Sequence, residues 1–158
     1  MLYRYLESSA EHRRDYIASI PHSAALGMDM VEVGAGRCVL RLPFQAPLAD
    51  VHGGLASGAV SALLDNAGGV AVFCSLARAT DFSTLSLRVE FITAPAAGRD
   101  VFARVECLRL EGRQAHIRGV ADCGDADRPG PPFATVSGVF FLKPNSEPLH
   151  DLASLGNV

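Results

Sequence analysis

Residues 57–79 have the sequence SGAVSALLDNAGGVAVFCSLARA, whose apolar side chains surround the helix that this stretch predicts. A helix that is apolar on all sides is buried on most of them. The small residues let a neighbouring backbone come close, although a glycine in a helix interior costs roughly 1 kcal/mol relative to alanine. We therefore expect a long central helix that the rest of the chain encloses.

A single carboxylate, Asp65, interrupts this apolar helix. Burying a carboxylate is unfavourable unless the group is paired, hydrogen-bonded or functional. Two interpretations follow from the pattern. Either Asp65 belongs to a functional site, or Asp65 and Asn66 make structural hydrogen bonds across a subunit interface.

The residues before the central helix predict a short helix and a hairpin. Residues 8–20 mix charged and apolar side chains, and Pro21 is expected to end that helix. Residues 26–43 predict two strands around a turn at Gly34–Gly36. This turn is not a GxGxxG phosphate loop, because Val39 stands in the place of the third glycine and no helix follows.

The residues after the central helix predict four strands in a meander. Residues 84–92 alternate, with Leu85, Leu87, Val89 and Phe91 on one face and Thr84, Ser86, Arg88 and Glu90 on the other. The other three strands are expected at residues 101–110, 114–123 and 133–142. The predicted fold is α+β, with an antiparallel sheet wrapped around one long central helix and an extra N-terminal helix.

The length and composition limit the number of domains and the kinds of partner. At 158 residues we expect one domain over residues 1–158, with a core at about 20–142 and a polar tail from Pro144. Hydrophobic residues make up 49% of the chain. We expect a homodimer assembling into a homotetramer to cover this apolar surplus. A net charge of −3 provides no basic stripe, so nucleic acid is not an expected partner.

The cysteines and the N-terminus indicate a reducing compartment. Cys38, Cys74, Cys107 and Cys123 are too far apart for a CxxC pair or a zinc cluster, and we expect buried free thiols. The N-terminus turns polar by Ser8 and lacks the apolar core of a signal peptide. No apolar run reaches about 18 residues without a polar interruption, so we expect no membrane span and a cytoplasmic protein.

The order of the elements and the run Gly58–Ala71 around Asp65 resemble the hotdog superfamily of thioesterases over residues 20–142. Within that superfamily the chain is similar to the phenylacetate-pathway, or PaaI-like, branch. The resemblance implies an acyl-coenzyme A (acyl-CoA) thioesterase in which Asp65 is the general base or the nucleophile. It also implies that the Gly58 N–H stabilises the oxyanion, that Thr84 assists from the partner subunit, and that no metal or redox cofactor is needed.

The start of the helix departs from the pattern of this family. Its members have His-Gly-Gly nine positions before the acid, whereas His52-Gly53-Gly54 stands thirteen positions before Asp65. Ala56-Ser57-Gly58 occupies the usual place, and we favour it as the helix start with Ser57 as N-cap. Candidate substrate-binding residues are His52, Gly53, Gly54, Ser57 and Asn66, and the alternative for His52 is an ordinary loop histidine.

Two other functions remain open on this fold. An acyl-thioester dehydratase would need a histidine paired with the acid, and a non-catalytic acyl-CoA-binding protein would need no base. A serine-hydrolase elbow is not present, because Ala56 holds the central position of Gly54–Gly58. Coenzyme A phosphates could be met by arginines on the predicted strands and loops, namely Arg88, Arg99, Arg104, Arg109, Arg113 and Arg118.

Overall fold

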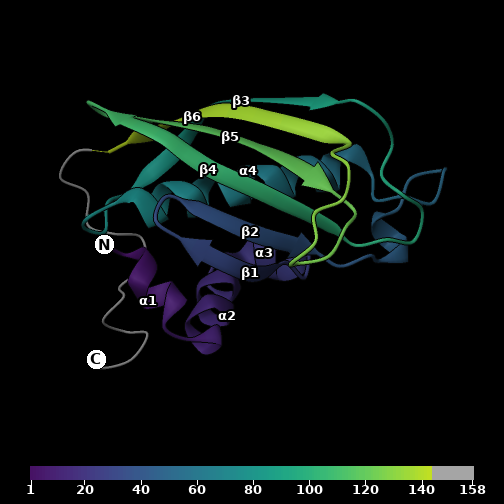
Figure 1. Cartoon of the computed structure of the whole chain (residues 1–158), viewed down its shortest axis with the longest axis horizontal. Coiled ribbons are helices and arrows are strands. Elements are labelled where there is room, and N and C mark those ends of the chain that lie inside the picture. Colours follow the sequence, from purple (N-terminus) through teal and green to yellow (C-terminus); the bar gives the residue numbers. More distant parts are fainter. Residues whose placement is uncertain (144–158) are drawn as a thin grey trace.

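The computed structural model describes residues 1–143 as an antiparallel sheet curved around one long helix (Figure 1). This arrangement confirms the predicted fold class, and the polar tail from Pro144 lies outside the described residues. The helices are α1 Tyr3–Glu7, α2 Ala10–Ala18, α3 Pro21–Ala25 and α4 Ser57–Ser75, with a 3-10 turn at Ala46–Leu48. The strands are β1 Asp29–Gly34, β2 Arg37–Leu42, β3 Phe82–Phe91, β4 Val101–Glu111, β5 Gln114–Asp122 and β6 Ala134–Leu142.

The central helix α4 is covered by the sheet along most of its length. Val60, Leu63, Leu64 and Ala67 are fully buried against the strands. The other side of α4, carrying Ser61, Ala62, Asp65, Asn66 and Gly69, is only half-buried. This agrees with the expectation that the central helix is buried on most of its sides. By length and composition α4 could also cross a membrane, but its packing against the sheet accounts for its apolar side chains.

The strand order is β1-β2-β4-β5-β6-β3, so the predicted four-strand meander is wrong for β3. Only β4, β5 and β6 form a meander, and β3 pairs with β6 at the upper edge of the sheet in Figure 1. Consecutive strands are usually neighbours, which is why the sequence favoured the simpler order. The connection 92–100 instead carries the chain to β2, so that β3 is left at an open edge.

The N-terminal region forms three short helices in place of the single predicted one. Pro21 opens α3 at its first position and does not close a helix, because proline fits the first turn, where its missing N–H is not needed. Ser19 ends α2 two residues earlier. α2 packs beside β1 and α3, at the lower edge of the sheet in Figure 1, and Tyr16, Ile20 and His22 share a cavity with the half-buried face of α4.

All four cysteines are free, and two of them are fully enclosed. Burial raises the pKa of Cys74 to about 12 and raises that of Cys38 well above its usual value. Because the thiolate is the reactive form, both should resist thiol reagents in the folded protein. We expect the half-buried Cys107 to be labelled in native protein at pH 8, Cys123 more slowly because burial raises its pKa as well, and all four thiols only after unfolding. Mass spectrometry of the labelled peptides checks this, and rapid native labelling of Cys38 or Cys74 would contradict the packing.

Candidate active site

A cavity of about 340 Å³ lies between α4, β3 and the N-terminal helices. Aromatic rings of Tyr16, Phe73, Phe82 and Phe140 form much of its wall, and Asp65 lies on the same wall. Tyr16 packs on Phe73 with ring centroids 4.9 Å apart. Burial, with a smaller contribution from two neighbouring cysteines, raises the pKa of Tyr16, so its phenol stays neutral. The cavity therefore joins an apolar chamber to a carboxylate.

The Asp65 carboxylate accepts a hydrogen bond from Thr84, with 2.8 Å between Oγ1 and Oδ1. The pairing register of β3 explains how this threonine reaches the helix. Thr84 pairs with Phe140 and Ser86 with Val139, so Leu85 is an extra residue that forms a bulge. Side chains of paired residues share a face, and Phe140 packs against α4 at Gly68.

The bulge reverses the predicted faces of β3 at Thr84 and Leu85 only, because Leu87 and Val89 stay half-buried against the core as their alternation predicts. Strict alternation puts Thr84 on the outer face with Ser86 and puts Leu85 on the inner face with Leu87. A slip of one residue reverses the faces beyond it, because side chains alternate with a period of two. Leu85 is consequently 61% exposed, and the Thr84 hydroxyl turns inward to Asp65.

Thr84 and Asp65 come from the same chain. The expectation that Thr84 meets the carboxylate of a neighbouring subunit is therefore wrong for this hydrogen bond, which links β3 and α4 within one subunit. Asp65 is half-buried and Thr84 is exposed, so the pair is open to the cavity. Since Thr84 holds Oδ1, the other carboxylate oxygen, Oδ2, is left to act on a bound molecule.

Asn66 lies beside Asp65 in the cavity wall and has two partners. Its Oδ1 accepts a hydrogen bond from Ser23 at 2.5 Å, and its Nδ2 donates to the Ala62 carbonyl at 3.2 Å. Ser23 belongs to α3 and is fully buried. The amide is thus held between the central helix and the N-terminal helices.

The helix opens at Ser57 and not at His52-Gly53-Gly54, as we favoured. Ala56 is the N-cap and makes no side-chain capping bond, so the prediction of Ser57 as N-cap is wrong by one position. His52, Gly53 and Gly54 form a turn before the helix, in which Gly53 has a positive φ of 84°. His52 is exposed, and none of these three residues is among those that line the Asp65 cavity.

Gly58 lies in the first turn of α4, exposed and with open space around its Cα. It precedes Asp65 by seven residues, which at the helical rise corresponds to roughly 10 Å. The Gly58 N–H and the Asp65 carboxylate of one chain are therefore too far apart to act on the same carbonyl group. Ser57 and Gly58 also lie outside the cavity that contains Asp65.

Two residues of the site were not predicted, Ser23 and His22. His22 borders both the Asp65 cavity and a second hollow, of about 280 Å³, beside Gly58 at the start of α4. Both residues follow Pro21, between the helix predicted at residues 8–20 and the hairpin predicted at residues 26–43. No local pattern marks them, because their role depends on α3 packing against α4.

The six arginines considered for coenzyme A phosphates do not line the Asp65 cavity. Four of them pair with acidic side chains, as in Arg104 with Asp122 at 2.8 Å and Arg118 with Glu106 at 2.7 Å. Within residues 1–143, no group of three or more histidine, cysteine or acidic residues is arranged to hold a metal ion. The chemistry available at the cavity is thus that of carboxylates, hydroxyls, an amide and an imidazole.

Comparison with known families agrees with this arrangement. A family model described as the thioesterase superfamily matches residues 50–128, which is half of the chain and includes α4 and the Asp65–Thr84 pair. The chain therefore belongs to the thioesterase superfamily. None of the curated proteins matches it.

Solved structures place the chain near one branch of the family. It resembles a variant of the phenylacetic acid degradation protein PaaI from Thermus thermophilus, at 27% identity and a TM-score of 0.65, over 77% of this chain and 97% of that one. A thioesterase family protein from Silicibacter pomeroyi shares 27% identity over 82% of this chain and 93% of its own, with a TM-score of 0.72. The E. coli PaaI protein, at 16% identity, shares the fold, with a TM-score of 0.68 over 85% of this chain and 96% of its own. The PaaI-like hotdog resemblance is confirmed.

Proposed function

We propose that this protein hydrolyses acyl-CoA thioesters to a free acid and coenzyme A, with Asp65 as the general base or the nucleophile. The observation that carries the proposal is the Asp65–Thr84 hydrogen bond at the mouth of an aromatic-walled cavity, within a thioesterase-superfamily fold. The aromatic wall offers an apolar chamber for the acyl group. Thr84 orients the carboxylate, so that one oxygen faces the substrate.

Hydrolysis at this site follows one of two routes. As a base, Asp65 Oδ2 takes a proton from water, the hydroxide oxygen bonds to the thioester carbon, and the C–S bond breaks as the proton passes to the leaving thiolate. As a nucleophile, the carboxylate attacks the carbon itself and displaces the thiolate, and water then opens the resulting anhydride. Both routes place negative charge on the carbonyl oxygen, which needs an N–H donor.

We propose that this donor is the Gly58 N–H of a second subunit. The separation of roughly 10 Å along α4 prevents the two groups of one chain from sharing a carbonyl. The N-terminus of a helix is suited to an oxyanion, because its first N–H groups have no partner within the helix. Two chains whose α4 helices run side by side in opposite directions would bring Gly58 of one to Asp65 of the other.

The open edge of the sheet supports such a dimer. Of the two edge strands in residues 1–143, β1 packs against α1 and α2, whereas β3 carries exposed apolar side chains at Leu85 and Phe91, with Ile92 just beyond its end. An exposed edge strand of this kind is a template for pairing with another strand. A second copy at β3 would also reach the half-buried face of α4. We propose a homodimer, assembled further into a homotetramer, located in the cytoplasm.

Light scattering coupled to size exclusion tests the assembly. We expect no folded monomer at micromolar concentration, because the apolar edge and the half-covered helix face stay buried only in the dimer. Leu85→Lys should shift the protein toward monomer and abolish turnover, whereas Leu108→Lys, at a comparably exposed position on the interior strand β4, should do neither. A stable, active wild-type monomer would contradict the shared site.

A panel of acyl-CoA substrates, assayed by release of the free thiol, tests the activity itself. Turnover that depends on Asp65 supports the proposal, and binding without turnover would favour the non-catalytic alternative. One observation favours the dehydratase alternative: His22 lines the same cavity as Asp65. Water addition to an enoyl-CoA that is faster than hydrolysis, and is lost in His22→Gln, would replace the first proposal by this second one.

A further inference from the structure

The N-terminal helices reach the candidate active site through one buried contact. Ser23 of α3 donates its hydroxyl to Asn66 of α4, with 2.5 Å between Oγ and Oδ1. Asn66 follows Asp65 in the chain, and both side chains line the same cavity. The family match begins at residue 50, so Ser23 lies in a segment that the family model does not include.

The two partners of Asn66 fix which way its amide faces. The Ala62 carbonyl can only accept a hydrogen bond, so the nitrogen of the amide must face Ala62. The amide oxygen therefore faces Ser23, whose hydroxyl must donate. This leaves the second hydrogen on Nδ2, for which residues 1–143 provide no partner. With the amide plane held at both ends, that hydrogen is available to a molecule in the cavity.

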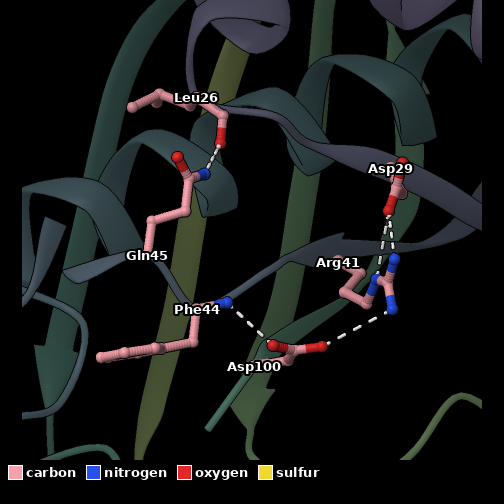
Figure 2. Close-up of polar contacts among 6 residues, drawn as sticks. All are labelled: Leu26, Asp29, Arg41, Phe44, Gln45 and Asp100. Carbon is pink, nitrogen blue, oxygen red and sulfur yellow. Dashed lines mark hydrogen bonds and ion pairs between the residues drawn. The ribbon is translucent and has the colours of Figure 1, made fainter. Parts of the chain in front are cut away.

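Ser23 is itself held in place by the backbone around it. The Met28 N–H donates to the Ser23 carbonyl at 3.0 Å, and the Gln45 side chain donates to the Leu26 carbonyl at 2.8 Å. Figure 2 shows the Gln45 contact and, next to it, Arg41 between Asp29 and Asp100. These bonds tie the end of α3 and the start of β1 to β2 and to the loop before β4. The hydroxyl is thus presented to Asn66 from a rigid position.

We propose that Ser23 is a positioning residue of the thioesterase site. By holding Asn66 Oδ1, it directs the free Nδ2 hydrogen of Asn66 to an acceptor atom of the bound acyl-CoA other than the reacting carbonyl oxygen, so that the bond is the same in the ground state and the transition state. Without the hydroxyl, the amide oxygen is left unsatisfied and turns toward water in the cavity, and the donor moves with it. The inference rests on the proposed function, because it assigns to Asn66 a substrate of that same reaction.

A double-mutant cycle tests the route through Asn66. Ser23→Ala should raise KM for the best acyl-CoA substrate about 10-fold and leave kcat within about threefold, since one neutral hydrogen bond to the bound substrate is lost. Asn66→Ala should do the same. In the Asn66→Ala background, Ser23→Ala should change KM less than about twofold, because the group it positions is already absent.

Ser19→Ala is the matched control. It removes a hydroxyl from the same helical region, where Ser19 Oγ donates to the Tyr16 carbonyl at 2.7 Å, and it should leave KM unchanged. Thermal melts of each variant monitor folding. If Ser23→Ala does not fold, Ser23→Thr keeps the hydroxyl donor and should retain the wild-type KM, whereas Asn66→Ala should still raise it.

The outcomes separate this inference from the proposed function. Absence of thioester hydrolysis in the wild type overturns the proposed function, and the role of Ser23 in it as well. Active wild type with an unchanged KM in Asn66→Ala overturns the inference alone. So does a KM effect of Ser23→Ala that persists in full in the Asn66→Ala background, because it would then reflect packing of α3.

Discussion

Asp65→Asn should lower kcat at least about 100-fold, as expected for loss of a general base or a nucleophile. Asparagine matches aspartate in shape and its amide oxygen can still accept from Thr84, so the fold should survive. The neutral amide cannot take a proton from water or attack a carbonyl. Steady-state hydrolysis of acyl-CoA, with a thermal melt of each variant, measures both effects.

Two further variants provide values of kcat with which the loss in Asp65→Asn can be compared. Thr84→Ala should cost kcat about 10-fold, because it removes only the group that orients the carboxylate. Asp81→Asn makes the same chemical change at the other acidic residue of the cavity, whose carboxylate lies 3.9 Å from Lys143 Nζ, and should stay within about threefold. A change in thermal stability with kcat unaltered in Asp65→Asn would make Asp65 a structural residue.

Mixed dimers are expected to show that Asp65 and Gly58 act from different subunits, with an equally large change in kcat. Gly58→Pro removes the proposed oxyanion donor in the first helical turn, where proline is tolerated, and should lower kcat about 100-fold. A heterodimer of an Asp65→Asn subunit with a Gly58→Pro subunit pairs the intact Asp65 of one with the intact Gly58 of the other. It should recover about half of the wild-type activity per dimer from two nearly inactive parents.

Two controls test the roles of the Gly58 N–H and of Thr84 separately. Gly58→Ala keeps the N–H, has open space for its methyl group, and should remain active. A heterodimer of Asp65→Asn with Thr84→Ala should not exceed the Thr84→Ala level, because Thr84 serves the Asp65 of its own chain. No recovery in the Gly58→Pro pair, with subunit exchange verified by native mass spectrometry, would rule out a donor from the second subunit.

Much of the fold follows from local pattern in the sequence. The apolar run at residues 57–79 predicted α4, although the helix ends at Ser75, where Leu76 takes an extended backbone. Glycines at positions 34 and 36 placed the hairpin of β1 and β2 correctly. Such signals suffice because the hydrophobic pattern of a helix and the residues of a tight turn each lie within one short segment of the chain.

The order of the strands could not be obtained in the same way. β3 pairs with the last strand and not with the next one, because the connection after β3 returns the chain to β2. The bulge at Leu85 could not be predicted either, because a bulge is defined by the pairing of β3 with its partner strand β6. A pairing register is a property of two segments, so the alternation of one strand cannot reveal it.

For the candidate site, the sequence by itself singled out Asp65 as the proposed carboxylate, because burying a single acid in an apolar helix has a high desolvation cost. Only the tertiary structure decided what surrounds it. The bulge turns Thr84 to Asp65 within one chain, and α3 brings Ser23 to Asn66 across 43 positions. The length of α4 separates Gly58 from Asp65. The contacts of Thr84 and Ser23 join segments far apart in the chain, and they form only because those segments pack together in the folded protein.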